Sequence, residues 1–348
     1  MMIHTKGDLQ QMQSLPLSAK ILMTKRRIRE WYDYWDGQVY VSFSGGKDST
    51  VLLHIARELY PDIEAVFVNT GLEYPEIQSF VKTFDNVTIL RPKMRFDEVI
   101  KKYGYPIISK GVSRKIDGAR KGQEWAKKYV DGTAKKKDGK KSFYTVEKYS
   151  PLVNADFLVS NQCCDIMKKT PAKYYTKQSG KKPITAQMAD ESKQRFAQWL
   201  QKGCNAFETK NPMSNPMSFW TEQDVLQYIK ENNIPIASVY GDVVYKEDGD
   251  QMRIEDYGIE GCGTEKLCTT GCNRTGCIFC AFGAHLDERG GGKSRFERLK
   301  ETHPRQYEYC IGGGEYVNGV WQPSKEGLGM GHVFDELNKI YGDGFIKY

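Results

Sequence analysis

The six residues from Ser44 to Ser49 have the types and the order needed to bind phosphate. They read Ser44-Gly45-Gly46-Lys47-Asp48-Ser49. The two glycines let the chain turn tightly and let a phosphate approach the backbone. The lysine adds a positive charge, the serines add hydroxyl donors, and backbone N–H groups at a turn that opens a helix bind anions. The pattern favours a phosphate site over an incidental glycine turn.

Hydrophobic spacing predicts the elements that hold this loop. Apolar residues alternate as in a strand over Gln38–Phe43 and recur at helical spacing over Asp48–Leu59. The alternation continues with strands at Ile63–Asn69 and Val87–Leu90 and helices at Pro75–Phe84 and Phe96–Tyr103. It predicts an α/β fold, a Rossmann-like parallel sheet with flanking helices. Ligands bind such sheets beyond the carboxyl ends of the strands, where the loop lies.

The loop does not meet the mononucleotide pattern G-x-x-x-x-G-K-[ST], because Val41 stands at its first glycine and Asp48 follows Lys47. S-G-G-K-D-S instead resembles the pyrophosphate loop (PP-loop) of the ATP pyrophosphatases. That superfamily cleaves ATP between the α and β phosphates and adenylates a substrate. The resemblance implies that Ser44–Ser49 bind ATP with Mg²⁺, and that Lys47 and Asp48 act in catalysis.

A second motif follows the next predicted strand. It reads Asn69-Thr70-Gly71-Leu72-Glu73-Tyr74-Pro75-Glu76. Because this motif follows the first loop by one strand–helix unit, the two together resemble the motifs of the phosphoadenosine phosphosulfate (PAPS) reductase family of the same superfamily. The resemblance spans about Gln38 to Cys310, and it implies nucleotide contacts from Thr70, Gly71 and Glu73.

Two basic stretches supply candidate phosphate or substrate contacts. The family resemblance places Lys110 and Arg114 beside phosphates, where arginine can bind with two hydrogen bonds and lysine acts as a point charge. A later stretch is similar to the family's G-x-R-x-x-E-S-x-x-R segment and adds Glu191 and Arg195. It departs from the family pattern at two positions, Ala186 and Met188.

The nine cysteines predict a metal or iron–sulfur site rather than a disulfide framework, because the chain shows no secretion signal. The pair Cys163-Cys164, followed much later by Cys277-x-x-Cys280, resembles the ligand pattern of the assimilatory adenylylsulfate reductases, which implies a [4Fe–4S] cluster. Zinc is the alternative, and the pair could be buried thiols. The competing ligands are Cys262, Cys268, Cys272 and Cys310. The stretch Arg274–Gly283 is similar to a subgroup with an R-T-G-C-x-F-C motif.

These features predict a PAPS reductase family ATP pyrophosphatase that adenylates a substrate and transfers sulfur to a nucleic acid, tRNA or DNA, with a sulfur donor protein as a further partner. One alternative is sulfonucleotide reduction, although the catalytic E-C-G-[LI]-H cysteine of the reductases is missing from the tail of this sequence. Another is a non-catalytic regulator that binds nucleotide and nucleic acid.

Composition sets the remaining limits. The 348 residues carry a net charge of +7, which favours polyanions, and a basic insertion is predicted near 131–145. No apolar run reaches the length of a membrane helix and Met1–Pro16 has no signal core, so we expect a cytoplasmic protein without membrane contact. The predicted domains are a helical extension (1–36), a PP-loop domain (37–238) and a Cys-rich region (239–348).

Six further elements are predicted from spacing and capping signals. Thr221 and Asp224 have the order of a helix start, with apolar residues following at helical spacing, and Trp220 is predicted to be core. The predicted strand is Pro183–Ala186, and the predicted helices are Ser18–Trp35, Val112–Val130, Ser160–Lys169, Asp190–Leu200 and Thr221–Asn232.

Overall fold

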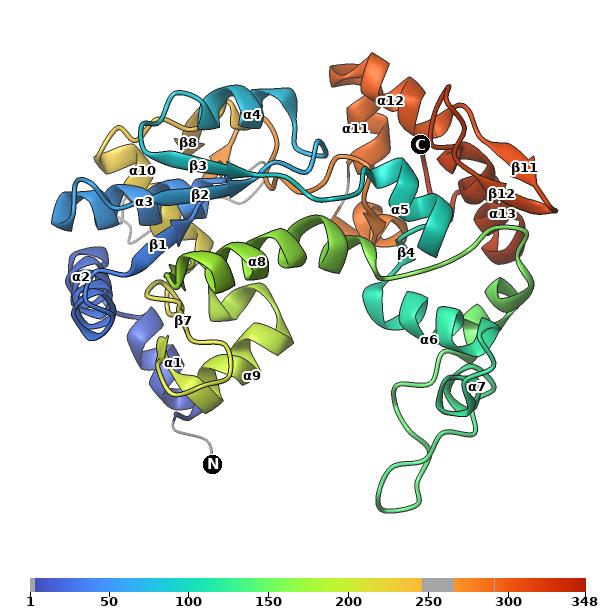
Figure 1. The fold of residues 1–348 in the computed structure, drawn as a ribbon, viewed down its shortest axis with the longest axis horizontal. Helices are drawn as coiled ribbons and strands as arrows, with labels where there is room; N and C mark the ends of the chain where they lie inside the picture. Colours follow the sequence, from blue (N-terminus) through green and yellow to red (C-terminus); the bar gives the residue numbers. More distant parts are fainter. Residues whose placement is uncertain (1–3, 246–265, 291) are drawn as a thin grey trace, which may run out of the picture. The chain divides into compact units, whose positions relative to one another are not determined.

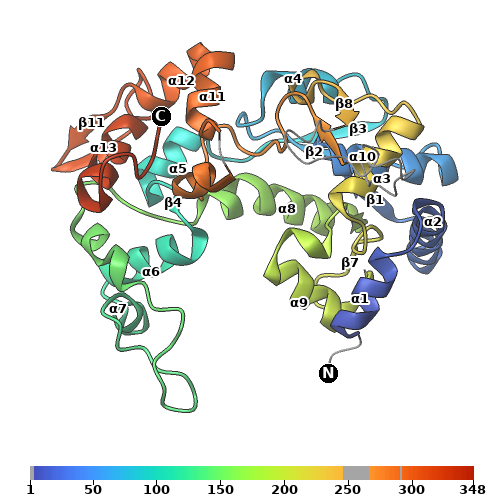
Figure 2. The same cartoon turned by 180° about the vertical axis from the view of Figure 1, so that it is seen from behind.

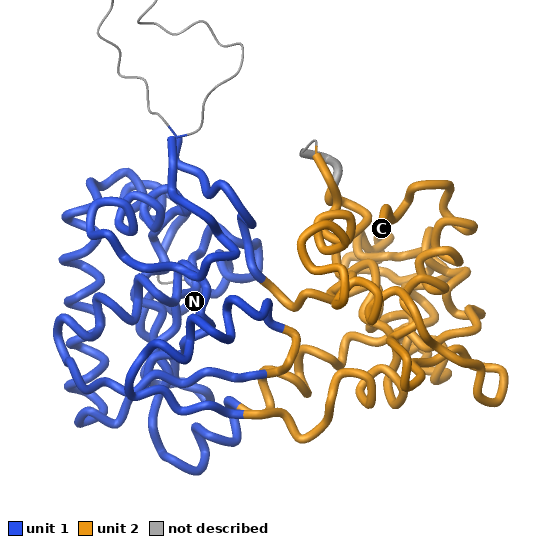
Figure 3. Tube along the Cα trace, turned by 90° about the horizontal axis from the view of Figure 1, so that it is seen from above, with its two compact units in different colours: residues 1–69, 73–90, 172–275 blue, residues 70–72, 91–171, 276–348 orange. Residues whose placement is uncertain are grey.

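The structure is a computed structural model that describes residues 4–245, 266–290 and 292–348. The chain forms two compact units, and each is made of segments that lie far apart in the sequence (Figure 3). Unit 1 contains residues 1–69, 73–90 and 172–275, and unit 2 contains residues 70–72, 91–171 and 276–348. The three predicted domains follow the sequence continuously and stay a prediction.

Unit 1 is built on a six-stranded sheet in the order β3-β2-β1-β5-β7-β6 (Figure 1). All neighbouring strands run parallel except β6, which is antiparallel to β7. The strands are β1 (Val39–Ser42), β2 (Ala65–Val68), β3 (Val87–Leu90), β5 (Lys182–Ile184), β6 (Asn205–Ala206) and β7 (Met213–Ser214). Val41 of β1 pairs with Ala65 on one side and Ile184 on the other. The predicted parallel α/β sheet is confirmed, and the loop after β1 leaves its carboxyl edge.

Helices cover this sheet and close its core. Helix α3 follows the loop and contacts β1, α2 and α10, so the loop is anchored on both sides. Trp31 and Trp220 are fully buried in this core, as predicted for Trp220. The helices of unit 1 are α1 (Lys6–Gln13), α2 (Leu17–Tyr34), α3 (Lys47–Leu59), α4 (Pro75–Val81), α9 (Lys193–Lys202) and α10 (Glu222–Glu231), with the antiparallel pair β8 (Val243–Tyr245) and β9 (Leu267–Thr269).

Unit 2 is mostly helical, with two small sheets. The parallel pair β4 (Ile107–Ile108) and β10 (Ala281–Phe282) joins its two long segments. The antiparallel pair is β11 (Glu315–Val317) and β12 (Val320–Gln322). The helices are α5 (Phe96–Tyr103), α6 (Lys110–Arg120), α7 (Glu124–Val130), α11 (Arg295–Thr302), α12 (Pro304–Ile311) and α13 (Met330–Tyr341), with a 3-10 helix at Glu147–Asn154. Helix α8 (Thr170–Ser179) begins in unit 2 and ends in unit 1.

Three predicted helices differ from the structure in ways that local bonds explain. The stretch Val112–Val130 is two helices, because Gly122 turns at φ +76° and the N–H of Gln123 donates to the carbonyl of Gly118, which closes α6. The stretch Ser160–Lys169 contains a π-helical turn, Asp165–Lys169, that runs on into α8.

The third helix, α9, begins at Lys193 rather than at Asp190. The hydroxyl of Ser192 accepts the N–H of Arg195 and caps the helix there, while Asp190 lies in a short 3-10 turn. By contrast, α10 begins where its capping signal predicts, because Thr221 and Asp224 form a capping box. None of the helices in the described part of the chain combines the length and apolar character needed to cross a bilayer.

Gly45 allows the loop after β1 to turn, and we expect Gly45→Ala to destabilise unit 1. Its φ is +71°, and an added Cβ would lie 2.8 Å from methyl groups of both Ile77 and Val81. Left-handed strain and overpacking together should lower the free energy of unfolding by about 2–4 kcal/mol. Urea denaturation measures this loss. Gly71→Ala is the control, because Gly71 has φ +74° but no atom within 4 Å of an added Cβ. An equal loss in both variants would contradict the packing argument.

Candidate nucleotide site and thiol group

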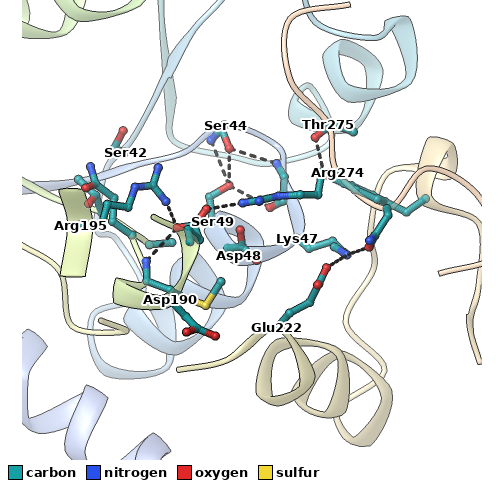
Figure 4. A pocket seen from close by; sticks show the side chains of 18 residues that line it. Ser42, Ser44, Lys47, Asp48, Ser49, Asp190, Arg195, Glu222, Arg274 and Thr275 are labelled. Atoms are coloured by element: carbon teal, nitrogen blue, oxygen red, sulfur yellow. Dashed lines mark hydrogen bonds and ion pairs between the residues drawn. The ribbon is translucent and has the colours of Figure 1, made fainter. Parts of the chain in front are cut away.

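A pocket of about 470 Å³ opens over the loop in unit 1 (Figure 4). Its volume lies within the range of small-molecule sites. The loop contributes one wall, and later segments of the chain contribute the others. The lining residues drawn there include Ser44, Lys47, Asp48, Ser49, Asp190, Arg195, Glu222, Arg274 and Thr275.

The loop is held by its own serines. The backbone N–H of Ser44 donates to Ser49 Oγ at 3.1 Å, and Ser49 Oγ donates to the carbonyl of Gly46 at 3.0 Å. Gly46 is the N-cap of α3, and no side chain caps the first turn of that helix. The helix N-terminus therefore keeps its donors and its positive dipole end for an anion.

Lys47 is the most enclosed cation of the pocket, with only 5% of its surface exposed. Its Nζ lies 3.2 Å from Glu222 Oε1 and 3.5 Å from Asn273 Oδ1, and 5.4 Å from the centre of the Tyr240 ring. The phenol of Tyr240 is hydrogen-bonded to Thr275, and burial raises the pKa of Tyr240 to about 12. These contacts hold the ammonium group in one place before any ligand arrives.

Asp48 presents a carboxylate to the pocket. Within the described part of the chain it forms no ion pair and accepts no hydrogen bond. Burial raises its pKa, and the charges of Lys47 and Arg274 only partly offset that effect. An enclosed carboxylate of this kind is suited to bind Mg²⁺, which uses one or two carboxylates together with substrate phosphates.

We expect Asp48→Asn to raise stability at neutral pH while it lowers activity. A raised carboxyl pKa means that the ionised form is costly in the folded state, so the contribution of Asp48 to stability falls as pH rises through its folded pKa. The asparagine variant avoids this cost. In urea denaturation its free energy of unfolding should therefore exceed that of wild type at about pH 7, and the difference should disappear near pH 4. Any nucleotide cleavage should fall about a hundredfold or more. A variant that is less stable at neutral pH would contradict the argument.

Two arginines share one carboxylate at the opposite wall. Glu191 Oε1 lies 2.6 Å from an amino group of Arg274, and its other oxygen is paired with Arg195. The same carboxylate accepts the backbone N–H of Met188 at 3.0 Å, and its side chain is 13% exposed. Glu191 therefore fixes two guanidinium groups at the edge of the pocket, which suits it to a ligand with several negative charges.

In unit 2, four thiols lie in one region. The Sγ atoms of Cys163 and Cys164 are 3.9 Å apart. The hydrogen bond to Cys164, burial and the nearby Cys280 and Cys277 raise the pKa of Cys163. The pKa of Cys164 is lowered by the same hydrogen bond and by the charge of Lys110. The predicted cysteines are thus near enough to influence one another electrostatically.

Backbone bonds brace the segment that carries Cys277 and Cys280. The N–H of Ile278 donates to the carbonyl of Leu72 at 2.8 Å, so the second motif of the sequence supports this turn. Arg295 donates to the carbonyls of Cys280 and Phe282, each at 3.0 Å, and is held by Asp287. The segment is therefore positioned by unit 2 itself.

No three His, Cys, Asp or Glu side chains among the described residues are grouped closely enough to hold a single metal ion. Tetrahedral zinc needs Zn–S distances of about 2.3 Å and hence closely spaced sulfurs. Thiolates of an iron–sulfur cluster bind different irons and stand farther apart. Both the [4Fe–4S] cluster and zinc therefore stay predictions.

Of the competing cysteines, the structure describes Cys268, Cys272 and Cys310. Cys268 and Cys272 belong to unit 1, and Cys310 is buried with its Sγ 3.5 Å from Met330 Sδ. Cys262 lies outside the described residues.

Comparison with known proteins identifies the family. The phosphoadenosine phosphosulfate reductase domain matches residues 38–121 and 96–281, which is more than half of the chain. The chain belongs to this family. The family prediction is thus confirmed for this PAPS reductase family protein, while the subgroup with the R-T-G-C-x-F-C motif stays a prediction.

Two uncharacterized proteins of Methanocaldococcus jannaschii resemble this PAPS reductase family member over shorter stretches. MJ0973 is 30% identical over 139 residues, which cover 36% of this chain and 34% of that protein. MJ0066 is 38% identical over 84 residues, which cover 23% of this chain and 18% of that protein. The chain thus spans about a third and about a fifth of their lengths. A crystal structure of PAPS reductase from Candida auris, a phosphate complex, aligns at TM-score 0.36 and 15% identity, covering 75% of this chain and 95% of that one.

The predicted site residues of this family member fall into two groups. Ser44, Gly46, Lys47, Asp48 and Ser49 line the unit 1 pocket together with Glu191 and Arg195. Thr70, Gly71, Lys110 and Arg114 belong to unit 2 with the four thiols. Glu73 belongs to unit 1 and is buried, but it is not among the described residues that line the pocket.

Sequence reasoning missed the part of the pocket formed by residues 273–275 and by Glu222 and Tyr240. Arg274 and Thr275 open the motif that contains Cys277, yet that motif indicated a metal site and not a nucleotide pocket. The isolated run of Asn273, Arg274 and Thr275, three hydrogen-bonding side chains beside a glycine, is the local signal that was present.

Proposed function

We propose that this protein is a PP-loop enzyme that binds ATP in the unit 1 pocket and cleaves it between the α and β phosphates, with transfer of AMP to an acceptor. One observation carries the proposal. The loop Ser44–Ser49, with its uncapped helix start and enclosed Lys47, lines the same pocket as the paired Arg195 and Arg274. Backbone donors and fixed cations around one cavity suit a polyphosphate.

Each group has a place in this reaction. Donors of the loop and Lys47 would bind the β and γ phosphates, with Lys47 exchanging Glu222 for a phosphate oxygen. An acceptor oxygen then forms a bond to the α phosphorus, its proton passes to solvent, and pyrophosphate leaves with the bridging oxygen and its electron pair. Asp48 would help to hold Mg²⁺, which supplies charge neutralisation on the phosphates when bound.

The thiols of unit 2 support a second part of the proposal. Cys163, Cys164, Cys277 and Cys280 would hold a [4Fe–4S] cluster, which supplies a site for sulfur chemistry when bound. In the proposed sequence, a sulfur nucleophile from a donor protein attacks the adenylated carbon of a nucleic acid, and AMP leaves. The net charge of +7 is consistent with a polyanionic acceptor.

Sulfonucleotide reduction is the second candidate, and the family match favours it, because the matching domain carries that name. The same pocket would then hold adenylylsulfate or its phosphorylated form. Reduced thioredoxin would supply the two electrons that convert the sulfate group to sulfite, and the adenosine nucleotide would leave.

One experiment tests both candidates. Protein purified without oxygen is incubated with α-labelled ATP and Mg²⁺, with and without total RNA or DNA, and the products are separated by thin-layer chromatography. We expect AMP or an adenylated product, increased by one nucleic acid. Parallel reactions contain adenylylsulfate and thioredoxin. If sulfite forms in these reactions and no AMP forms from ATP, the protein is a sulfonucleotide reductase and the first proposal is wrong. If ATP binds but neither product forms, the protein is a non-catalytic regulator.

A further inference from the structure

The positive charge of this protein is concentrated in one stretch of unit 2. Between residues 110 and 148 the sequence has thirteen lysines and arginines and five acidic residues, an excess of eight positive charges. The whole chain carries +7, so the rest of the chain is close to neutral. Figures 1 and 2 show α6 and α7 side by side, with the loop after α7 extending beyond them. A local excess of this size attracts polyanions.

Aromatic rings lie among these charges and are accessible. Trp125 is 41% exposed, and Phe143 and Tyr144 are 85% and 74% exposed. The guanidinium of Arg114 lies 5.1 Å from the centre of the Trp125 ring, and Lys136 Nζ lies 3.3 Å from that of Phe143. Exposed rings on which bases can stack, with cations beside them, are a feature of single-strand binding sites.

Trp125 and Arg114 form one side of a hollow of about 470 Å³. Gly118 lets α7 approach α6 closely there, because an added Cβ would lie 2.7 Å from the Cβ of Ala126. Polar groups complete the lining and can hydrogen-bond the edges of a base. These groups are Asp117, Lys121, Gln123, Asn161, Gln162 and Asp165.

Part of the lining of this hollow comes from the segment that carries the thiol pair. Gln162 and Asp165 line the hollow, and Cys163 and Cys164 lie between them in the chain. Lys110 is the first residue of α6, and Arg114 follows it by one helical turn. A group bound in the hollow would therefore contact the chain segment that carries the thiols.

We propose that this hollow binds one unstacked base of a single-stranded nucleic acid, with Trp125 and Arg114 as the stacking surface and the lysines of residues 127–141 as phosphate contacts. This proposal rests on the proposed function, and it adds that the nucleic-acid acceptor is single-stranded. Single strands are favoured over a duplex because the rings are exposed for stacking on bases, which a duplex keeps paired and stacked.

Fluorescence anisotropy of labelled DNA and RNA oligonucleotides, each offered as a single strand and as a duplex of the same sequence, tests the proposal. We expect tighter binding to single strands. Trp125→Ala should weaken that binding about tenfold or more, whereas Trp125→Phe, which keeps a ring, should stay within a few-fold of wild type. Quenching of tryptophan fluorescence by the strand should shrink in both variants. Circular dichroism checks that both variants fold.

The salt dependence tests the lysines separately. Replacing Lys135, Lys136 and Lys137 by serine should weaken the salt dependence of single-strand binding. The magnitude of the negative slope of log K against log salt should fall by about 2. The matched control replaces Lys82, Lys202 and Lys325, which are exposed and lie outside residues 110–148. It makes the same change in net charge, and its slope should stay near that of wild type. Equal slopes for the two triple variants would overturn the assignment of the surface.

Other results would also overturn the proposal. These are a preference for duplex, unchanged binding by Trp125→Ala, or binding of anionic lipid vesicles in place of single strands. The proposed function fails separately, if single strands bind as expected but no nucleotide is cleaved. Cleavage without any single-strand binding would contradict this inference and leave the proposed function intact.

Discussion

Lys47→Ala is expected to reduce the formation of AMP from ATP by about 10²–10³-fold, with little change in fold. The ammonium group is enclosed and held by Glu222 and Asn273, so it is already in position when charge develops on the phosphates. Its loss removes that stabilisation from the transition state. The measurement is the initial rate of AMP release at saturating ATP and Mg²⁺.

Lys25→Ala is the matched control. Lys25 also belongs to unit 1 and pairs with a glutamate, Glu58, at 2.9 Å, but it does not line the pocket. Loss of this surface ion pair should change the stability of the protein very little. The rate of AMP release should therefore change by less than about twofold. If Lys47→Ala kept a rate within about threefold of wild type, the loop would not be the site of phosphate chemistry.

Cys277→Ser is expected to remove the proposed cluster. Wild-type protein purified without oxygen should contain about four iron and four sulfide per chain and absorb visible light, and the variant should lose most of both. The physical reason is that a serine hydroxyl binds iron less readily than a thiolate, and that Cys277 shares its turn with Cys280. Iron, sulfide and zinc analysis together with the absorption spectrum are the measurements.

Cys268→Ser controls for the loss of a cysteine, because Cys268 belongs to β9 in unit 1 and should leave the iron content unchanged. Two results would revise the assignment. If the wild-type protein contains zinc instead of iron, and only Cys277→Ser loses it, the four ligands stand but the bound group is zinc and not a cluster. Iron lost in Cys268→Ser but kept in Cys277→Ser would move the site to the competing cysteines.

Local patterns predicted the parts of the fold that depend on neighbouring residues. Helix Phe96–Tyr103 and strand Val87–Leu90 lie where the spacing of apolar residues places them, and α10 begins at its capping box. The turn at Gly122 was also readable, since Arg120 and Lys121 before a glycine are typical of a helix end. The predicted helix nevertheless ran on to Val130, past this local signal.

The arrangement of distant segments was not predictable in the same way. No local pattern states that β5 lies beside β1, or that residues 273–275 return to the loop at Ser44–Ser49 more than 200 residues after it. The pairing of Glu191 with the two arginines was also not predictable from local patterns. Glu191 was a candidate substrate contact from its motif, but its pairing with Arg274 depends on tertiary structure.

The discontinuity of unit 2 affects how the protein is made. Cys163 and Cys164 leave the ribosome more than 100 residues before Cys277 and Cys280, and strand β4 is made more than 170 residues before its partner β10. At synthesis rates of about 5–20 residues per second, the delay between the two thiol pairs is roughly 5–20 s. Throughout that interval the first thiol pair has no partners and cannot complete a four-thiol site. Assembly of the proposed cluster is therefore post-translational or coincides with the last stage of synthesis, and a nascent chain stalled within residues 172–275 would carry the Cys163-Cys164 pair without the other two ligands.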